Sequence, residues 1–441
     1  MKRIAPYYFS LIFVVLVGGI CGAQQAASAP AAGNAAPATI TLQDALRMAQ
    51  ANSPQFRAAV TDAGMAREDK VQARAGMLPG LSYQAQFLYT EGNGTPSGRF
   101  IANNSVHEYV SQGNAHEVMG LGPVAEYRRT AALEAAARAR LEIAERGLVV
   151  TVTSTYYNLV VAQREYANAQ LALTAAQDFL RISRDLERGG EVAHSDVIKA
   201  ELQRNERTQQ LAEAQLAMQT ARLDLAVLIF PNFTQDFTVV DDLRLPPPLP
   251  AFAEAQKLAA AKNPDLKQAV ENLQAARQGV LVAWAGHLPS LSFDYWYGID
   301  ASHFATQTAG VRNLGYAAAA TLNLPVFNWG ATESKVKQAG LQRQQAQVEL
   351  SYTQRQLVAR LQSAYAEATV ARAALDNLRN SAELAAESER LTTLRYRAGE
   401  ASALEVVDAQ NTLAQARNAY DQGELRYRVA LATLQTLTGS F

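Results

Sequence analysis

Cysteine is almost absent from the sequence, and the single one, Cys21, lies in an N-terminal segment that we expect to be removed. Two basic residues precede an apolar run over 8–20, and small residues follow up to Ala23, a pattern typical of a secretory signal peptide spanning 1–23. The mature chain would then contain no cysteine, which excludes disulfides and thiol catalysis. Lipidation of Cys21 is the less favoured alternative, because Ile20 stands where a lipoprotein signal has Gly or Ala.

Long apolar runs and an excess of charge of one sign are also missing. The net charge of −1 argues against a basic nucleic-acid-binding protein. After the signal, no segment approaches the ~18 apolar residues of a transmembrane helix, so any membrane-spanning part must consist of strands. Walker A, G-x-S-x-G, H-E-x-x-H and dinucleotide-binding motifs do not occur, and the five histidines lack the ligand spacing of a metal site. We therefore expect no enzymatic activity, no cofactor and no metal.

Proline is absent from Val124 to Phe230 and after Pro325, which predicts very long helices. Apolar and small residues at three- and four-residue spacing predict that these helices pack closely along one seam. Glycines near 190 and 399 interrupt them, so each stretch is expected to form a helical hairpin. The chain runs 67 positions from Pro123 to Gly190 and 74 from Pro325 to Gly399, so we expect the second long helix to be one heptad longer.

The sequence is a tandem duplication. Three landmarks recur at nearly one offset: Pro54 and Pro264 are 210 positions apart, Leu78-Pro79 and Leu288-Pro289 are 210 apart, and Gly190 and Gly399 are 209 apart. After a flexible leader over 24–40, we expect a first repeat over 41–249 and a second over 250–441. Each begins with one helix, at Thr41 or Pro250, and continues with a β-hairpin and a long helical hairpin. The first repeat adds an equatorial segment near 231–250.

Alternating apolar residues predict one strand in each repeat. They are Leu81, Tyr83, Ala85, Phe87 and Tyr89 in the first and Leu291, Phe293, Tyr295, Tyr297 and Ile299 in the second. Together with Trp296, these aromatic residues suggest a lipid-facing band, although ordinary soluble hairpins are the alternative. Weaker returning strands are expected near 116–121 and 316–324. Four strands are too few to close a barrel, so transmembrane strands would require several chains to share one.

The opening Thr41 to Leu46 with Asn52-x-Pro54, the Leu-Pro pairs before the strands, the segment 324–327 and the two tip glycines resemble TolC-type outer-membrane efflux proteins (outer membrane factors). The resemblance implies a mainly α fold with β strands. It further implies a homotrimer with a 12-stranded β-barrel, four strands per chain, continued by a long α-helical barrel. The protein would be the passive exit duct of a tripartite efflux or type I secretion system. Its location would be the bacterial outer membrane, with the helices in the periplasm.

The partners implied by the resemblance are a periplasmic adapter (membrane fusion) protein, an inner-membrane pump and outer-membrane lipid, with no nucleic acid. The alternative function is that of a periplasmic coiled-coil adapter or scaffold. Such a protein would usually carry one helical hairpin between β-rich halves, whereas this sequence predicts two hairpins and amphipathic aromatic strands.

Acidic residues near the hairpin tips are the main candidate functional residues. Glu405 and Asp408 are three apart and therefore share a helix face. The resemblance implies a periplasmic gate and selectivity ring of Asp196, Tyr396, Glu405 and Asp408. The arginine of the family falls at Ala401 here, so Arg395, Arg397 or Lys199 would have to replace it. An ordinary solvated helix face is the alternative.

The tip segments also resemble the motif that meets the adapter. The implied docking residues are Arg188, Gly190 and Ser195 in the first repeat and Arg397, Gly399 and Ser402 in the second. The alternative is a simple helix–turn–helix cap.

Overall fold

The computed structural model describes residues 38–89, 107–232, 236–243 and 247–439. By its contacts the chain divides into residues 1–38 and residues 39–441, and the second unit is described here by itself. The expected signal peptide, Cys21, almost all of the leader over 24–40 and the loop over 91–105 lie outside the described residues.

The sequence predicts one helix at the start of each repeat, but the structure has two. In the first repeat these are α1 (Leu42–Asn52) and α2 (Pro54–Ala75); in the second they are α5 (Phe252–Lys262) and α6 (Pro264–Ala285). The break comes from proline at the first helical position and from a capping side chain before it. Ser53 accepts a hydrogen bond from the backbone N–H of Phe56, and Asn263 does the same for Leu266.

Four strands form one antiparallel sheet in the order β2–β3–β5–β8. Their bounds are β2 (Gly80–Tyr89), β3 (His107–Met119), β5 (Ser290–Ala301) and β8 (Leu314–Asn323). The returning strand β3 is thus much longer than the predicted 116–121. A small hairpin of β6 (Gln307–Thr308) and β7 (Val311–Arg312) lies between β5 and β8. Among the described strands, β2 and β8 each pair on one side only, so the sheet they form has two open edges.

The long helices are α3 (Leu121–Arg188), α4 (His194–Ile229), α7 (Ala331–Arg397) and α8 (Ala403–Thr438). The prediction that the second long helix is one heptad longer is wrong, since α3 has 68 residues and α7 has 67. The seven extra positions lie in a non-helical connection before α7. It ends with two residues of positive φ, Trp329 (55°) and Gly330 (80°), so the helix cannot start near Pro325.

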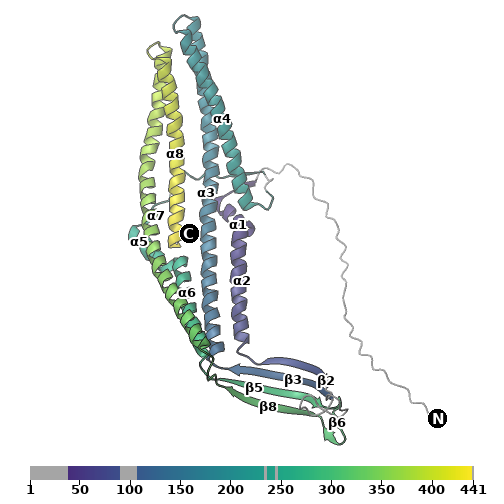
Figure 1. The fold of residues 1–441 in the computed structure, drawn as a ribbon. Helices are drawn as coiled ribbons and strands as arrows, with labels where there is room; N and C mark the ends of the chain where they lie inside the picture. The colour runs from purple at the N-terminus through teal and green to yellow at the C-terminus, as the bar shows by residue number, and fades with distance from the viewer. Residues whose placement is uncertain (1–37, 90–106, 233–235, 244–246, 440–441) are drawn as a thin grey trace, which may run out of the picture. The chain divides into compact units, whose positions relative to one another are not determined.

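Within the unit 39–441, each long hairpin packs along itself and the two hairpins meet through α3 and α8. The resulting order α7–α8–α3–α4 leaves α7 and α4 at the edges, and the hairpin tips lie at the end away from the sheet (Figure 1). Nearer the sheet, α6 lies between α3 and α7, and α2 packs on α3. Close packing has a specific requirement at Gly423 of α8, where a Cβ would lie 2.6 Å from Leu378 of α7.

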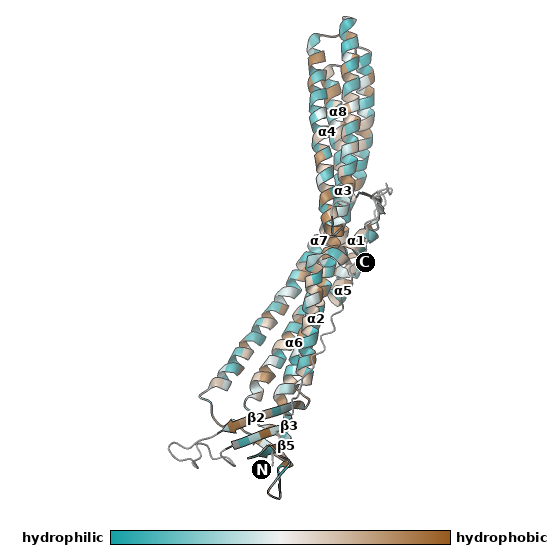
Figure 2. Ribbon diagram, turned by 90° about the vertical axis from the view of Figure 1, so that its right-hand side faces the viewer, coloured by the Kyte–Doolittle hydropathy of each residue, from teal (hydrophilic) through white to brown (hydrophobic). Residues whose placement is uncertain are grey.

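The main hydrophobic core lies where the hairpins meet the short elements. It surrounds Tyr156 and Tyr157 of α3 and includes residues of α1, α4 and the two-stranded sheet of β1 (Ala38–Ile40) and β4 (Phe237–Val239). The hydroxyl of Tyr156 lies 3.1 Å from the carbonyl oxygen of Ile40 and 2.8 Å from that of Val240, so it joins both strands to the long helix. Along the helices, hydrophobic and hydrophilic residues are interleaved (Figure 2), as expected for helices that pack on one another and still face water.

Candidate functional site

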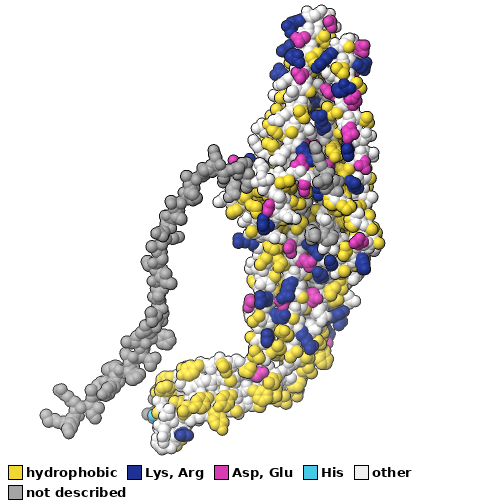
Figure 3. Space-filling model, turned by 180° about the vertical axis from the view of Figure 1, so that it is seen from behind, with side chains coloured by type: hydrophobic (Ala, Val, Ile, Leu, Met, Phe, Trp, Pro, Cys, Tyr) yellow, Lys and Arg dark blue, Asp and Glu magenta, His cyan; other side chains and the backbone are white. Residues whose placement is uncertain are grey.

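The four-stranded sheet has one apolar and one polar face. Strand register places Leu81, Ala115, Tyr295 and Ala318 in one row across the sheet. The next row of this face contains Tyr83, Tyr297 and Tyr316. Large side chains on this face are exposed, Leu81 by 83% and Tyr316 by 76%. Hydrophobic side chains gather over the sheet in Figure 3, whereas charged ones are spread over the helices. An exposed apolar face of this extent marks contact with lipid or with another protein.

Aromatic contacts reinforce the apolar face. The rings of Tyr295 and Tyr316 stack with centroids 6.1 Å apart, and those of Phe87 and Tyr109 lie 4.8 Å apart. Trp296 does not belong to this face, contrary to the predicted lipid-facing band, because its neighbours Tyr295 and Tyr297 alternate with it. Trp296 lies on the opposite face, with Asn114 and Ala317 as cross-strand partners.

The polar face carries a cross-strand pair of His116 and Asp294, whose Nδ1 and Oδ1 atoms are 2.7 Å apart. The described residues contain no group of three His, Cys, Asp or Glu side chains placed to hold a metal ion. Nor is any described helix apolar over enough of its length to span a bilayer.

Both hairpin tips use the same backbone turn. Gly190 and Gly399 adopt positive φ of 77° and 75°. The N–H after each glycine donates to a carbonyl five residues back, Glu191 to Leu186 at 2.9 Å and Glu400 to Arg395 at 2.8 Å. This is the Schellman arrangement that ends a helix on a left-handed glycine. The glycines predicted for docking therefore have a definite structural reason for being glycine.

Tyr396 is buried between the two hairpins and has only 1% of its surface exposed. Its ring packs edge-on against Phe179 of α3 at 5.1 Å, and its hydroxyl lies 3.0 Å from the Ser183 hydroxyl. Val197 of α4 and Val406 of α8 complete the contact. Burial raises the pKa of Tyr396, against the effect of the Ser183 hydrogen bond. The residue thus joins all four long helices just below the tips.

The predicted gate carboxylates lie on the helices that follow the turns. Asp196 pairs with Lys199 at 3.2 Å on the same helix. Glu405 accepts hydrogen bonds from the N–H and hydroxyl of Ser402, each at 3.0 Å, and its second oxygen lies 3.6 Å from Arg395. The Ser402 bonds hold the pKa of Glu405 below its usual range, and Arg395 adds to that effect. Asp408 is exposed one turn further along α8.

Two of the proposed substitutes for the family arginine therefore pair within the chain, Arg395 with Glu405 and Lys199 with Asp196. Ala401 packs against the Tyr396 cluster. Arg397 is exposed. The remaining docking candidates, Ser195 and Arg188, are also at the surface, and Arg188 contacts Asp185.

Sequence reasoning missed a charged network in the middle of the long helices. Arg164 of α3 donates to Asp241 of the equatorial segment at 2.6 Å and to Asp421 of α8 at 3.1 Å, and it also contacts Glu424. Burial opposes the charge of Arg164, but its hydrogen bonds to Asp241 and Glu424 raise its pKa above the ordinary value. Burial also raises the pKa of Asp421, although Arg164 lowers it. The three-residue spacing of Asp421 and Glu424 was the available signal.

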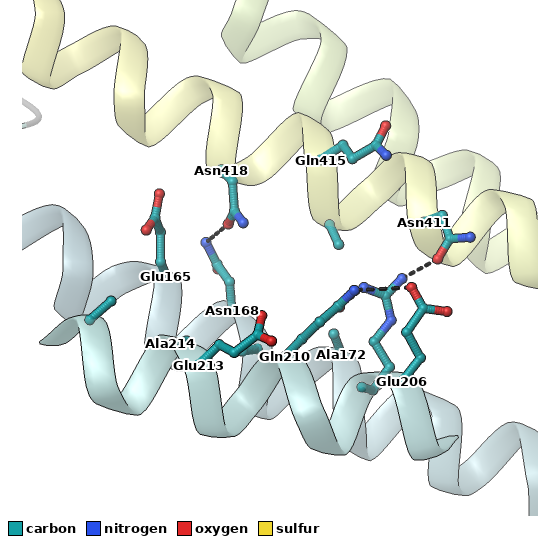
Figure 4. Close-up of a pocket in the computed structure, with 14 residues that line it drawn as sticks. Glu165, Asn168, Ala172, Glu206, Gln210, Glu213, Ala214, Asn411, Gln415 and Asn418 are labelled. Carbon is teal, nitrogen blue, oxygen red and sulfur yellow. Dashed lines mark hydrogen bonds between the residues drawn. The ribbon is translucent and has the colours of Figure 1, made fainter. Parts of the chain in front are cut away.

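A polar cavity of about 450 Å³ lies nearer the tips between α3, α4 and α8 (Figure 4). Buried Arg207 donates to the amide oxygens of Gln210, at 2.6 Å, and Asn411. Burial lowers the pKa of Arg207, and the charge of Glu206 offsets part of that effect. The hydrogen bond from Arg207 to Asn411 joins α4 to α8 across this polar layer and so helps to fix the relative position of the two helices.

Comparison with known proteins bears on what these surfaces do. The family model described as outer membrane efflux protein matches residues 256–440. The proteases secretion protein PrtF of Dickeya chrysanthemi is 24% identical over 423 residues, which cover 90% of this chain and 88% of the relative. The outer membrane protein TolC of Escherichia coli K12 is 24% identical over 423 residues, covering 89% of this chain and 82% of TolC.

Solved structures share the fold. The CmeC outer membrane channel of Campylobacter jejuni matches with a TM-score of 0.76 at 20% identity, over 90% of this chain and 85% of CmeC. The open state of the MtrE outer membrane channel of Neisseria gonorrhoeae matches with a TM-score of 0.74 at 22% identity, over 90% and 88% of the two chains.

An amphipathic open sheet joined to paired long helical hairpins, with these similarities, defines an outer-membrane channel protein and not an enzyme. Residues 256–440 match the outer membrane efflux protein family, and TolC-type relatives are similar to this chain over about nine-tenths of its length. The predicted fold class, outer-membrane location and channel function are thereby confirmed, and the alternative of a periplasmic adapter is set aside.

Proposed function

We propose that three copies of this chain form a ring in which the sheets close one 12-stranded β-barrel and the long helices form an α-helical barrel. The single observation that carries this proposal is the open sheet with one apolar exposed face. A membrane does not tolerate unpaired strand edges. Since β2 and β8 run antiparallel within the sheet, β8 of one copy can pair antiparallel with β2 of the next, and three sheets of four strands give 12.

The helical part supports the same ring. The edge helix α4 exposes Leu202, Leu216 and Val227, and the opposite edge helix α7 exposes Val370 and Leu384. Two different edges that both expose apolar side chains suit a head-to-tail contact, which closes into a ring when the rotation allows. Two copies would give eight strands, enough only for a barrel filled by side chains, so a conducting lumen favours three.

The ring would be the passive exit duct of a tripartite efflux or type I secretion system. Relatives named for protease secretion and for efflux support both possibilities. A periplasmic adapter would dock on the tips, at Arg188, Gly190, Ser195, Arg397, Gly399 and Ser402, and an inner-membrane pump would supply the energy. Asp196, Glu405 and Asp408 would face the narrow end and favour cations there. Tyr396 would act as the buried contact that holds the tips together.

Disulfide crosslinking tests the ring. Leu216 lies 26 residues after Gly190 on α4, and Ala373 lies 26 residues before Gly399 on α7, so the two positions are at equal heights below their tips. Oxidation of the variant carrying both Leu216→Cys and Ala373→Cys in native membranes should give a ladder that ends at three chains.

The matched controls are the two single variants, each of which has one introduced cysteine in the mature chain and should give no ladder. Crosslinking within one chain is excluded because α4 and α7 lie at opposite edges. A ladder that ends at two or four chains, or no crosslink in membranes, contradicts the proposed trimer.

A further inference from the structure

Trp296 is a large aromatic side chain on the polar face of the sheet. The register pairs it with Asn114 on β3 and Ala317 on β8. It lines an open pocket of about 510 Å³ together with Gln112, Asp300 and the small residues Gly298, Gly315 and Ala317, and its side chain is only half-buried. Its partly exposed ring can therefore contact a ligand, since an indole offers both an apolar face and a polar N–H.

Several residues beside Trp296 have little or no side chain. A Cβ at Gly298 would lie 2.2 Å from the Ser111 carbonyl oxygen and 2.4 Å from the Gln112 Cα, so no larger residue fits this close approach to β3. On the other side, Gly315 and Ala317 of β8 add almost no side-chain bulk. The indole is therefore the largest side chain on the polar face at this pocket, which Asn313 and Tyr316 also line, and the small residues beside it leave space.

The carboxylates on the polar face of the sheet make this face negatively charged. Asp294 and Asp300 flank Trp296 on β5, and Glu108 of β3 lies beside Asp300. His116 pairs with Asp294, and the sequences of the four strands contain no Lys or Arg. A tryptophan face attracts cations through its quadrupole, and a nearby carboxylate adds to that attraction. The pocket thus complements a ligand with both an aromatic or alkyl body and a positive charge.

We propose that Trp296 lines the lumen of the strand barrel and forms, with Asp300, a contact site for organic cations that pass through the channel. This inference rests on the proposed function, because the polar face becomes a lumen only in the closed ring. It makes Trp296 a specificity-determining residue, repeated once per chain around the duct.

Fluorescence quenching tests the location. In a Trp284→Phe, Trp329→Phe background, Trp296 is the only tryptophan. In proteoliposomes it should be quenched by aqueous acrylamide and hardly by brominated phosphatidylcholine. The matched control adds Trp296→Phe and Tyr297→Trp, which moves the indole one residue along β5 to the apolar face, and should show the reverse. Stronger quenching of Trp296 by the brominated lipid overturns the proposal.

Channel block tests the ligand class. Benzyltrimethylammonium, added on the strand side in planar bilayers, should reduce the current saturably, and Trp296→Ala should weaken the block about five-fold or more. Asp300→Asn should weaken it to a smaller extent, whereas Tyr297→Ala should leave it unchanged. Equal block by benzyl alcohol, or equal block of the Trp296→Ala channel, overturns the proposal.

Crosslinked trimers that conduct but show no such block would refute the Trp296 site and leave the proposed channel intact, while absence of trimers would refute the channel itself.

Discussion

The two hairpin tips occupy equivalent places in the duplicated sequence and share their glycine turn, yet they are stabilised differently. With the offset of 209 that relates Gly190 to Gly399, buried Tyr396 corresponds to Glu187, and the capping residue Ser402 corresponds to Ala193. The second tip has a capping box, whereas α4 begins without a side-chain cap. Both tips thus keep the backbone turn, which needs glycine, but their side chains differ: the second tip contributes a buried tyrosine and a capping serine, which the first tip lacks.

The largest expected difference concerns Tyr396. Tyr396→Ala should destabilise the tip region by about 3–5 kcal/mol, because it leaves a cavity where four helices meet. Hydrogen exchange of amides near the tip measures this local free energy of opening. Glu187→Ala, the matched change in the first repeat, removes only a surface contact with His194 and should cost less than about 1 kcal/mol. Similar costs for both changes would show that the tips are not energetically distinct.

The cap of α8 should matter less. Ser402→Ala removes the hydrogen bond to the Glu405 N–H and should cost about 1 kcal/mol, read from faster exchange in the first turn of α8. The converse change, Ala193→Ser, should slow exchange in the first turn of α4 by supplying the missing cap. If Ala193→Ser has no effect, the difference between the two helix starts has a cause other than capping.

The carboxylates should affect ion selectivity more modestly. Glu405→Ala combined with Asp408→Ala should raise single-channel conductance or lower the permeability of cations relative to anions, by about three-fold. Asp196→Ala should change less, because Lys199 already balances its charge. Planar-bilayer recordings of the double variant that match the wild type would refute the gating role.

The smallest effect is a pH dependence of the second tip. The folded pKa of Glu405 is lowered, so its contribution to the helix cap is present above the ordinary glutamate value of 4.5 and is lost as pH falls through the lowered value. Exchange in the first turn of α8 should therefore speed up specifically below about pH 4.5. Glu405→Gln should remove this pH dependence, whereas Ser402→Ala should remove only part of it, because the backbone N–H at position 402 still donates to Glu405. Persistence of the pH dependence in Glu405→Gln would assign it to another group.

Periodicity predicted much of this architecture because it reports directly on which residues share a face. The glycine turns, the proline-free helices and the alternation in β2 and β5 all appear in the structure. The prediction that Trp296 belongs to the lipid-facing band is wrong because Trp296 alternates with Tyr295 and Tyr297 and therefore lies on the opposite face. The prediction of a single first helix in each repeat is also wrong. Pro54 and Pro264 each stand at the first position of a new helix, where proline is tolerated.

The two hairpin tips could be located from sequence, but their contacts could not. Tyr396 is buried only because α7 and α8 lie against α3 and α4, and no local pattern states which helices of different repeats are neighbours. The same holds for Arg164, whose partners are 77, 257 and 260 positions away. The prediction that the second long helix is one heptad longer is wrong because the positions just before α7 are not helical. Positive φ at Trp329 and Gly330 excludes these positions from the helix.

Burial of Tyr396 sets a thermodynamic condition on opening. If the hairpins separate at the tips, the ring loses its contact with Phe179 and its hydroxyl loses Ser183. A partner can shift this equilibrium only by binding the open form more tightly than the closed form. If the closed form is favoured by about 3 kcal/mol per chain, the partner must bind the open form about 150-fold more tightly per chain to make the two forms equally populated. Passive leakage through an unpartnered duct is then restrained by side-chain packing, in addition to charge.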